Sequence, residues 1–178
     1  MSTKPSYLGL LNAIAVGEGR GYSLLSSWSR ASTNDELKRV LDFVAIREQE
    51  HCAAFTKRIC ELGFTVRANT SATFDEHLAL AGSKSSDQEK FETILGYGNG
   101  EPASEDPLSN LFDNATIDVQ TGTLLGRFIA EERDSGRRLR AQYEVLDGAA
   151  PDAELNDIAA RLDRLTDTIE ELKQMRQT

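Results

Sequence analysis

The stretch Leu37–Leu62, LKRVLDFVAIREQEHCAAFTKRICEL, combines the spacing of a buried helix with two ionisable residues on its apolar face. Intervals of three and four residues separate its apolar positions, which predicts an amphipathic helix; these positions are Leu37, Leu41, Val44, Phe55, Ile59 and Leu62. Glu48 and His51 continue the same face. An unpaired carboxylate in an apolar interior costs several kcal/mol of folding free energy, so the charge on this face needs a partner.

Glu48 and His51 have two interpretations. Glu-x-x-His on an inward helix face is the spacing by which helical bundles hold iron or manganese. The alternative is a buried polar pair, hydrogen-bonded within itself or to an arginine of a neighbouring helix. Since short motifs recur by chance, the decision depends on whether other helices supply carboxylates at the same depth.

The composition bounds the class of protein. The 178 residues, 39% hydrophobic and 28% charged, suit one soluble domain spanning 1–178. The net charge of -9 argues against nucleic acid or an anionic membrane as partner. Apolar runs are too short for a membrane span, and the first residues lack a secretion signal, so we expect a cytoplasmic protein.

The two cysteines, Cys52 and Cys60, fall on one predicted helix. Eight residues at a rise of about 1.5 Å each separate them by about 12 Å, which is too far for a disulfide. Reduced thiols fit the cytoplasmic expectation. No Cys-x-x-Cys pair is present, which excludes a thiolate iron or zinc module.

Residues 6–31 are predicted to form the first long helix, with Glu18 in the middle of its apolar stripe. Three glycines, Gly17, Gly19 and Gly21, surround that carboxylate. Glycine inside a helix costs about 1 kcal/mol relative to alanine, so these positions need a reason. We expect close approach of another helix; a local bulge that aims Glu18 is the alternative.

The second helix is predicted over 33–62, with Thr33 or Asn34 as its N-cap and Gly63 at its end. The short connection from the first helix makes the two antiparallel neighbours. Glu18 and Glu48 both lie near the midpoints of their helices. They are therefore expected at similar heights, which favours the metal interpretation.

Residues 64–112 form a long connection with short helices expected at about 74–81 and 87–97. His77 in the first of these is expected to be a packed surface histidine rather than a ligand. The third long helix is predicted over 113–147. An advance of 100° per residue places Glu132 inward and Glu131 to one side as a solvated neighbour. Ser135 then occupies the position of a possible second histidine.

The last helix is predicted over 152–176, with a seam of apolar residues at alternating intervals of three and four and no inward carboxylate: Leu155, Ile158, Leu162, Leu165, Ile169 and Leu172. A second apolar strip, Leu10, Leu24 and Trp28, flanks the first helix beside Gly17 and Gly21. We expect a homodimer with either this strip or the seam at its interface; the alternative is that both are buried within one bundle.

Four long helices with the long connection after the second, carrying Glu18, Glu48-x-x-His51 and Glu132, resemble the ferritin-like di-iron carboxylate proteins, nearest to the rubrerythrin type. The resemblance implies an all-α four-helix bundle with Glu18 as a terminal ligand, Glu48 bridging and His51 on one metal. It implies Glu132 as a second bridge or a terminal ligand. The chain departs from the family where Ser135 replaces a second histidine, and it lacks a rubredoxin module.

Two function classes follow from these residues. One is a metal-binding protein with one or two Fe or Mn ions per chain, either an oxidoreductase or an iron-handling protein that meets oxygen, peroxide or another small molecule. The other is a degenerate ferritin-like bundle that acts as a non-catalytic binding or scaffolding module. The inward carboxylates favour the first class, and the missing ligands favour the second.

Overall fold

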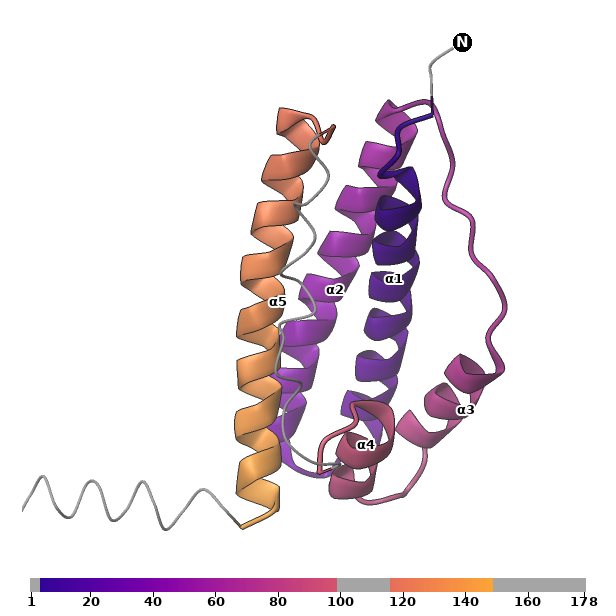
Figure 1. The fold of residues 1–178 in the computed structure, drawn as a ribbon. Helices are drawn as coiled ribbons and strands as arrows, with labels where there is room; N and C mark the ends of the chain where they lie inside the picture. The colour runs from indigo at the N-terminus through magenta and orange to yellow at the C-terminus, as the bar shows by residue number, and fades with distance from the viewer. Residues whose placement is uncertain (1–3, 99–115, 149–178) are drawn as a thin grey trace, which may run out of the picture. The chain divides into compact units, whose positions relative to one another are not determined.

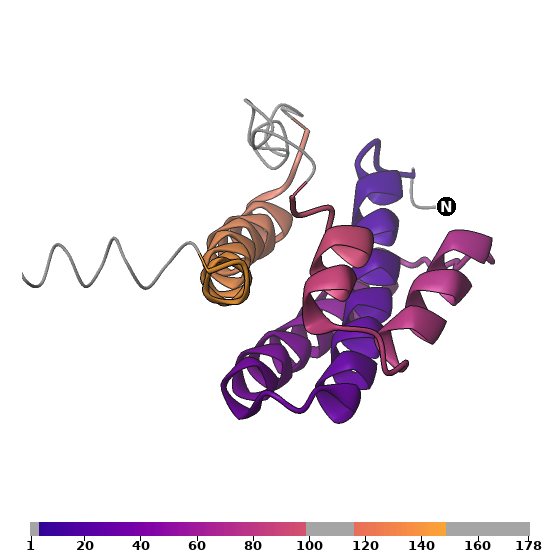
Figure 2. The same cartoon turned by 90° about the horizontal axis from the view of Figure 1, so that it is seen from below.

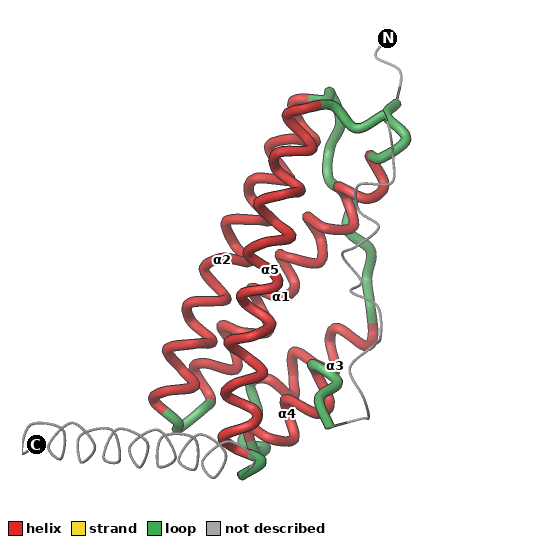
Figure 3. The backbone as a smooth tube through the Cα atoms, turned by 60° about the vertical axis from the view of Figure 1, so that its left-hand side comes forward, coloured by secondary structure: helices red, strands yellow, loops and turns green. Residues whose placement is uncertain are grey.

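The computed structural model describes residues 4–98 and 116–148, and within these ranges every regular element is a helix (Figures 1 and 3). The all-α prediction is therefore confirmed for this part of the chain. In chain order the helices are α1 (Leu8–Ala31), α2 (Asp35–Glu61), α3 (Ala72–Ala81), α4 (Asp87–Ile94) and α5 (Val119–Leu146). None of these is long and apolar enough to cross a membrane.

The chain divides into two compact units, residues 1–140 and 141–178. The first unit holds α1 to α4 and most of α5. The predicted helix 152–176 and its apolar seam lie outside the described residues, and so does the stretch 99–115. The single-domain prediction stays a prediction.

Helices α1 and α2 form an antiparallel hairpin, as their short connection predicts (Figure 1). Asn34 is the N-cap of α2, and its side chain accepts hydrogen bonds from the backbone N–H groups of Glu36 and Leu37 at 3.1 Å. Gly63 follows the C-cap with a φ of 85°, a left-handed conformation that glycine adopts without strain. Both predicted ends of this helix are confirmed.

Helix α5 runs antiparallel to α2. Residues later in α2 contact residues earlier in α5, and residues earlier in α2 contact residues later in α5. Arg58 of α2 donates to Thr121 at 2.9 Å, and one turn away the ring of Phe55 meets Phe128 edge-on. Further along, His51 and then Arg47 contact α5. In Figure 2, which looks roughly along the helices, α1 and α2 lie against each other and α5 is seen as a distinct helix.

The core lies where these three helices meet. Its buried members are apolar apart from the phenol oxygen of Tyr7, and they come from all three helices and the residue that precedes α1: Tyr7, Leu8, Leu11, Ile14, Ala15, Phe55, Ile59, Leu125, Phe128 and Ile129. The periodic stripes therefore face one another, as their spacing predicts.

Helix α5 begins later than the predicted residue 113, because Thr116 to Asp118 are not helical. Asp118 precedes the helix, and its Oδ1 accepts from the backbone N–H of Thr121 at 3.0 Å. This is the arrangement of an N-cap, which stops a helix from extending further back. The hydrophobic spacing alone does not reveal it.

The short helix α4 covers one end of α1. The Trp28 indole of α1 is fully buried, donates to Asp87 at 2.7 Å and meets Phe91 edge-on at 4.7 Å. Ser32 donates to the other oxygen of Asp87 at 2.8 Å. Trp28, one of the residues expected at a dimer interface, is therefore buried within the chain, whereas Leu24 is half-buried.

Candidate metal centre

The close approach of α2 to the glycines of α1 positions Glu18 and Glu48. A Cβ at Gly21 would lie 2.3 Å from Oε2 of Glu48, and one at Gly19 would lie 3.3 Å from Sγ of Cys52. Gly17 has open space around it. The expectation of close helix packing is thus confirmed at two of the three glycines, and α1 remains a regular α-helix beside Glu18.

Glu18, His51 and Glu132 come together from three different helices. One ligand atom of each lies within 4.8 Å of the others, so that the three could hold a metal ion. Glu18 and His51 are buried, and the Glu132 side chain is 22% exposed. Three of the four predicted ligands therefore meet at one level, with the histidine in the middle.

The His51 ring is held between carboxylates on both of its nitrogens. Its Nδ1 lies 3.0 Å from Oε2 of Glu18, and its Nε2 lies 2.7 Å from Oε2 of Glu131. The ring also meets Phe128 edge-on at 5.2 Å. These contacts fix the ring plane, so the Nδ1 face points at Glu18 and Glu132.

Glu132 Oε1 is the one buried side-chain oxygen or nitrogen without a hydrogen-bond partner among the described residues. It lies 3.4 Å from Nδ1 of His51, on the same side of the ring as Glu18. A buried oxygen without a hydrogen bond costs free energy. Its position inside the cluster makes it available as a ligand atom.

Glu48 is half-buried beside this group, although it is not among the three residues whose ligand atoms converge. Burial, the negative charges of Glu18 and Glu132, and a hydrogen bond with Glu18 raise its pKa to about 9. Burial also raises the pKa of Glu18. At neutral pH Glu48 is therefore protonated and donates to the Glu18 carboxylate.

His51 has the opposite charge preference. Burial by itself lowers the pKa of the imidazole, but the contacts with Glu132, Glu18 and Glu131 outweigh burial and raise it to about 10. In the absence of metal the ring is therefore an imidazolium. A metal at this place would take over the positive charge, release the Nδ1 proton and ionise Glu48.

The prediction that Glu131 is a solvated neighbour was wrong. Its side chain is only 26% exposed, and it accepts the hydrogen bond from Nε2 of His51 while its other oxygen pairs with Arg127 at 3.0 Å. A 100° step separates adjacent residues on a helix, yet a glutamate side chain is long enough to reach around the helix. Glu131 and Glu132 thus contact His51 from opposite sides.

The alternative interpretation of Glu48 and His51 as a pair bonded to each other is not what the structure shows. Each finds its partner in a carboxylate of another helix. Within residues 4–98 and 116–148, no arginine forms a hydrogen bond or ion pair with either of them. His77 lies on α3, half-buried and outside the cluster, as expected.

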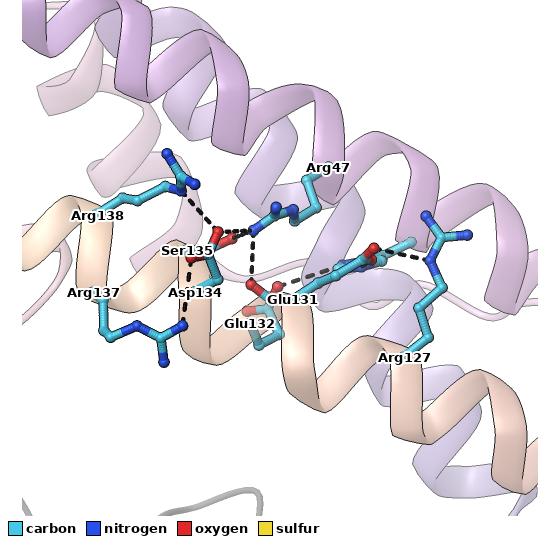
Figure 4. Close-up of polar contacts among 9 residues, drawn as sticks. Arg47, Arg127, Glu131, Glu132, Asp134, Ser135, Arg137 and Arg138 are labelled. Carbon is cyan, nitrogen blue, oxygen red and sulfur yellow. Dashed lines mark hydrogen bonds and ion pairs between the residues drawn. The ribbon is translucent and has the colours of Figure 1, made fainter.

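Arg47 is a part of this region that the sequence did not single out. Its Nη1 donates to the carbonyl oxygen of Glu131 at 2.9 Å, to Oδ2 of Asp134 at 3.0 Å and to Oγ of Ser135 at 3.0 Å (Figure 4). Its position four residues before His51 on α2 was the available signal. A helix turn places both residues on one face.

No known protein family, characterised protein or solved structure matches this chain. The interpretation of the site therefore depends on its own geometry. The donor set comprises carboxylate oxygens and one imidazole nitrogen without a thiolate, which suits iron, manganese or zinc better than a soft metal such as copper(I).

Proposed function

We propose that this chain is a metal-binding protein of the ferritin-like type, holding Fe(II) or Mn(II) through Glu18, Glu48, His51 and Glu132. The single observation that carries the proposal is the convergence of Glu18, His51 and Glu132, in which the buried Oε1 of Glu132 has no hydrogen bond and only a 3.4 Å ion pair with His51. Three helices bring negative charge to one place at a cost in free energy. A divalent cation offsets that cost better than one imidazolium does.

The two nitrogens of His51 have separable roles in this proposal. Glu131 accepts from Nε2, so that Nδ1 is left with its lone pair toward Glu18 and Glu132 once the imidazolium proton is lost. A carboxylate that orients a ligating histidine in this way is a common feature of metal sites. Glu131 is therefore a positioning residue rather than a ligand.

The proposed activity is oxidoreductase or iron-handling chemistry with oxygen, peroxide or another small oxidant. A bound redox-active ion supplies the electron for such chemistry, and the protein supplies the oxygen and nitrogen ligands. Phe128 places an apolar ring edge-on beside His51, at 5.2 Å between the ring centroids. We also propose that residues 152–176 complete a four-helix bundle.

The second candidate function is a bundle that binds or scaffolds without metal. The observation that favours it is the pairing of His51 on both nitrogens, which satisfies the imidazolium without an ion. In that case the hydrogen bonds and ion pairs of the cluster keep α1, α2 and α5 in register. Glu132 Oε1, which is buried without a hydrogen bond, argues against it.

Metal content decides between the two. Protein purified without chelator and then equilibrated with Fe(II) without oxygen, or with Mn(II), is expected to retain metal in elemental analysis. His51→Ala and Glu132→Gln should each abolish tight binding. Glu50→Gln is the matched control, because Glu50 precedes His51 on α2 but its side chain is 62% exposed.

The positioning role of Glu131 has its own test. Glu131→Gln should weaken metal binding by about 10- to 100-fold without abolishing it, as expected for a residue that orients a ligand. Titration with Mn(II) measures the difference. Wild-type protein that binds no metal, or a Glu50→Gln variant that loses it as His51→Ala does, would contradict the proposed function.

A further inference from the structure

Arg47 occupies the flank of the cluster where α2 meets the next turn of α5. Its side chain is only 16% exposed, and a single nitrogen, Nη1, binds three oxygens of α5. Figure 4 shows this guanidinium directed at the helix between Glu131 and Ser135. It is thus a fixed internal cation one helical turn from His51.

The oxygens that Arg47 binds are the ones a second metal ion would need. Ser135 lies three residues after Glu132, the place of the histidine in a second Glu-x-x-His, and it is buried with its hydroxyl directed at Arg47. The other carboxylate on this turn, Asp134, also pairs with Arg138 at 2.7 Å and Arg137 at 3.4 Å. Among the described residues of this flank, the oxygens that could act as metal ligands are thus already engaged by arginines.

Charge leads to the same result. Glu18, Glu48 and Glu132, when all are ionised, carry three negative charges, which one divalent ion and a neutral His51 nearly balance. Glu131 is engaged by His51 and Arg127. A second divalent ion would lie next to the guanidinium cation of Arg47, and like charges in a partly buried site repel strongly.

We propose that the centre holds one divalent ion per chain and that Arg47 takes the place of a second. This inference rests on the proposed metal-binding function and specifies its nuclearity. Arg47 is accordingly a specificity-determining residue: it contacts no ligand atom of the cluster, but its charge and its hydrogen bonds exclude the second ion.

Stoichiometry with Mn(II) tests the inference. Wild-type protein saturated with Mn(II) should bind one ion per chain in elemental analysis and give the six-line EPR spectrum of an isolated ion. Ser135→His, which restores a ligand but keeps Arg47, should also bind one. The double variant Arg47→Ala with Ser135→His should bind two and show the spectrum of a spin-coupled pair.

Arg138→Ala is the matched control, because Arg138 pairs with the same Asp134 but from the exposed face of α5. It should leave one ion per chain. Circular dichroism establishes that each variant is folded. A purely structural Arg47 would change the melting temperature when substituted but not the number of ions.

Two ions in the wild type would overturn the inference while leaving metal binding intact, and so would a folded double variant that binds only one. No ion in the wild type would instead overturn the proposed function itself. Should the double variant fail to fold, the wild-type stoichiometry and its EPR spectrum still decide the question.

Discussion

His51 and Glu48 both carry a proton in the metal-free protein at neutral pH, and this makes the stability of that form dependent on pH. The pKa of His51 rises to about 10 from its ordinary 6.5, and that of Glu48 to about 9 from 4.5. A raised folded-state pKa gives stability that is complete below the unfolded value and is lost as pH rises through the folded value. Both residues act in the same direction.

The melting temperature of the metal-free protein should therefore fall as pH increases from about 6.5 to 9. In Glu48→Gln the amide imitates the protonated carboxyl, so its melting temperature should fall less steeply over the same range. Thermal melts in the presence of chelator at several pH values provide the measurement. A wild-type melting temperature that rises with pH would contradict the assignment.

These pKa values also change the pH range expected for metal binding. An unperturbed histidine predicts loss of affinity below about pH 6 to 6.5. Because the ion has to displace protons from groups that titrate near 9 and 10, affinity should already increase with pH from 7 upward. The excess of carboxylates in the cluster thus determines the pH range over which the metal is expected to bind.

The glycines beside Glu18 offer a paired test at the same scale. Gly21→Ala places a methyl group where Glu48 Oε2 now lies, so the carboxylate must move and metal affinity should fall. Gly17→Ala meets open space and should stabilise the protein by up to about 1 kcal/mol through helix propensity, with affinity unchanged. Melting curves and Mn(II) titrations compare the two, and equal affinities would refute the steric argument.

At the scale of the helices, Asp118 joins the start of α5 to the other two long helices. One of its oxygens accepts from the Tyr7 hydroxyl at 2.6 Å and from Arg58 at 3.0 Å, and the other caps the helix. The hydrogen bond from Tyr7 is the main cause that holds the pKa of Asp118 well below its usual range. The stability it contributes is present above the unfolded pKa and is lost as pH falls.

Asp118→Ala should reduce the free energy of unfolding by about 1 to 2 kcal/mol, the usual cost of losing an N-cap. Asp118→Asn retains a capping oxygen and should cost less. Urea denaturation at neutral pH measures both. A loss in Asp118→Ala no larger than in Asp118→Asn would show that the cap contributes little.

At the scale of the whole molecule, metal binding should stabilise the fold by mass action. An ion at 100 times its dissociation constant adds about 2.7 kcal/mol. For a chain of this size that corresponds to a rise of about 5 to 10 °C in melting temperature. Differential scanning calorimetry with and without Mn(II) measures it. His51→Ala should show no rise, and a rise equal to that of the wild type would place the ion elsewhere.

The homodimer remains a prediction at this scale. Trp28 is buried by α4, so within the apolar strip of the first helix only Leu10 and Leu24 remain for an interface, and the seam of 155–172 is the other candidate. Light scattering at micromolar concentration should give twice the mass of the chain. A monomer mass would remove the prediction.

Several features of this protein follow from the sequence alone. The helices, the Asn34 cap and the inward placement of Glu18 and His51 are local: they depend on 3.6-residue periodicity and on side chains near their own backbone. The hairpin of α1 and α2 follows from a short connection. Glu-x-x-His could therefore be recognised as a candidate site before any contact between helices was known.

Other features depend on the packing of the helices against one another. Glu131 contacts His51, Glu132 retains an oxygen without a hydrogen bond and Arg47 fills the neighbouring turn only because α5 packs against α2 in one particular register. The angular position of a residue on its helix does not predict how far a long side chain extends or which charged group of another helix it contacts. Pairing is a property of two surfaces in contact, and only the tertiary structure brings those surfaces together.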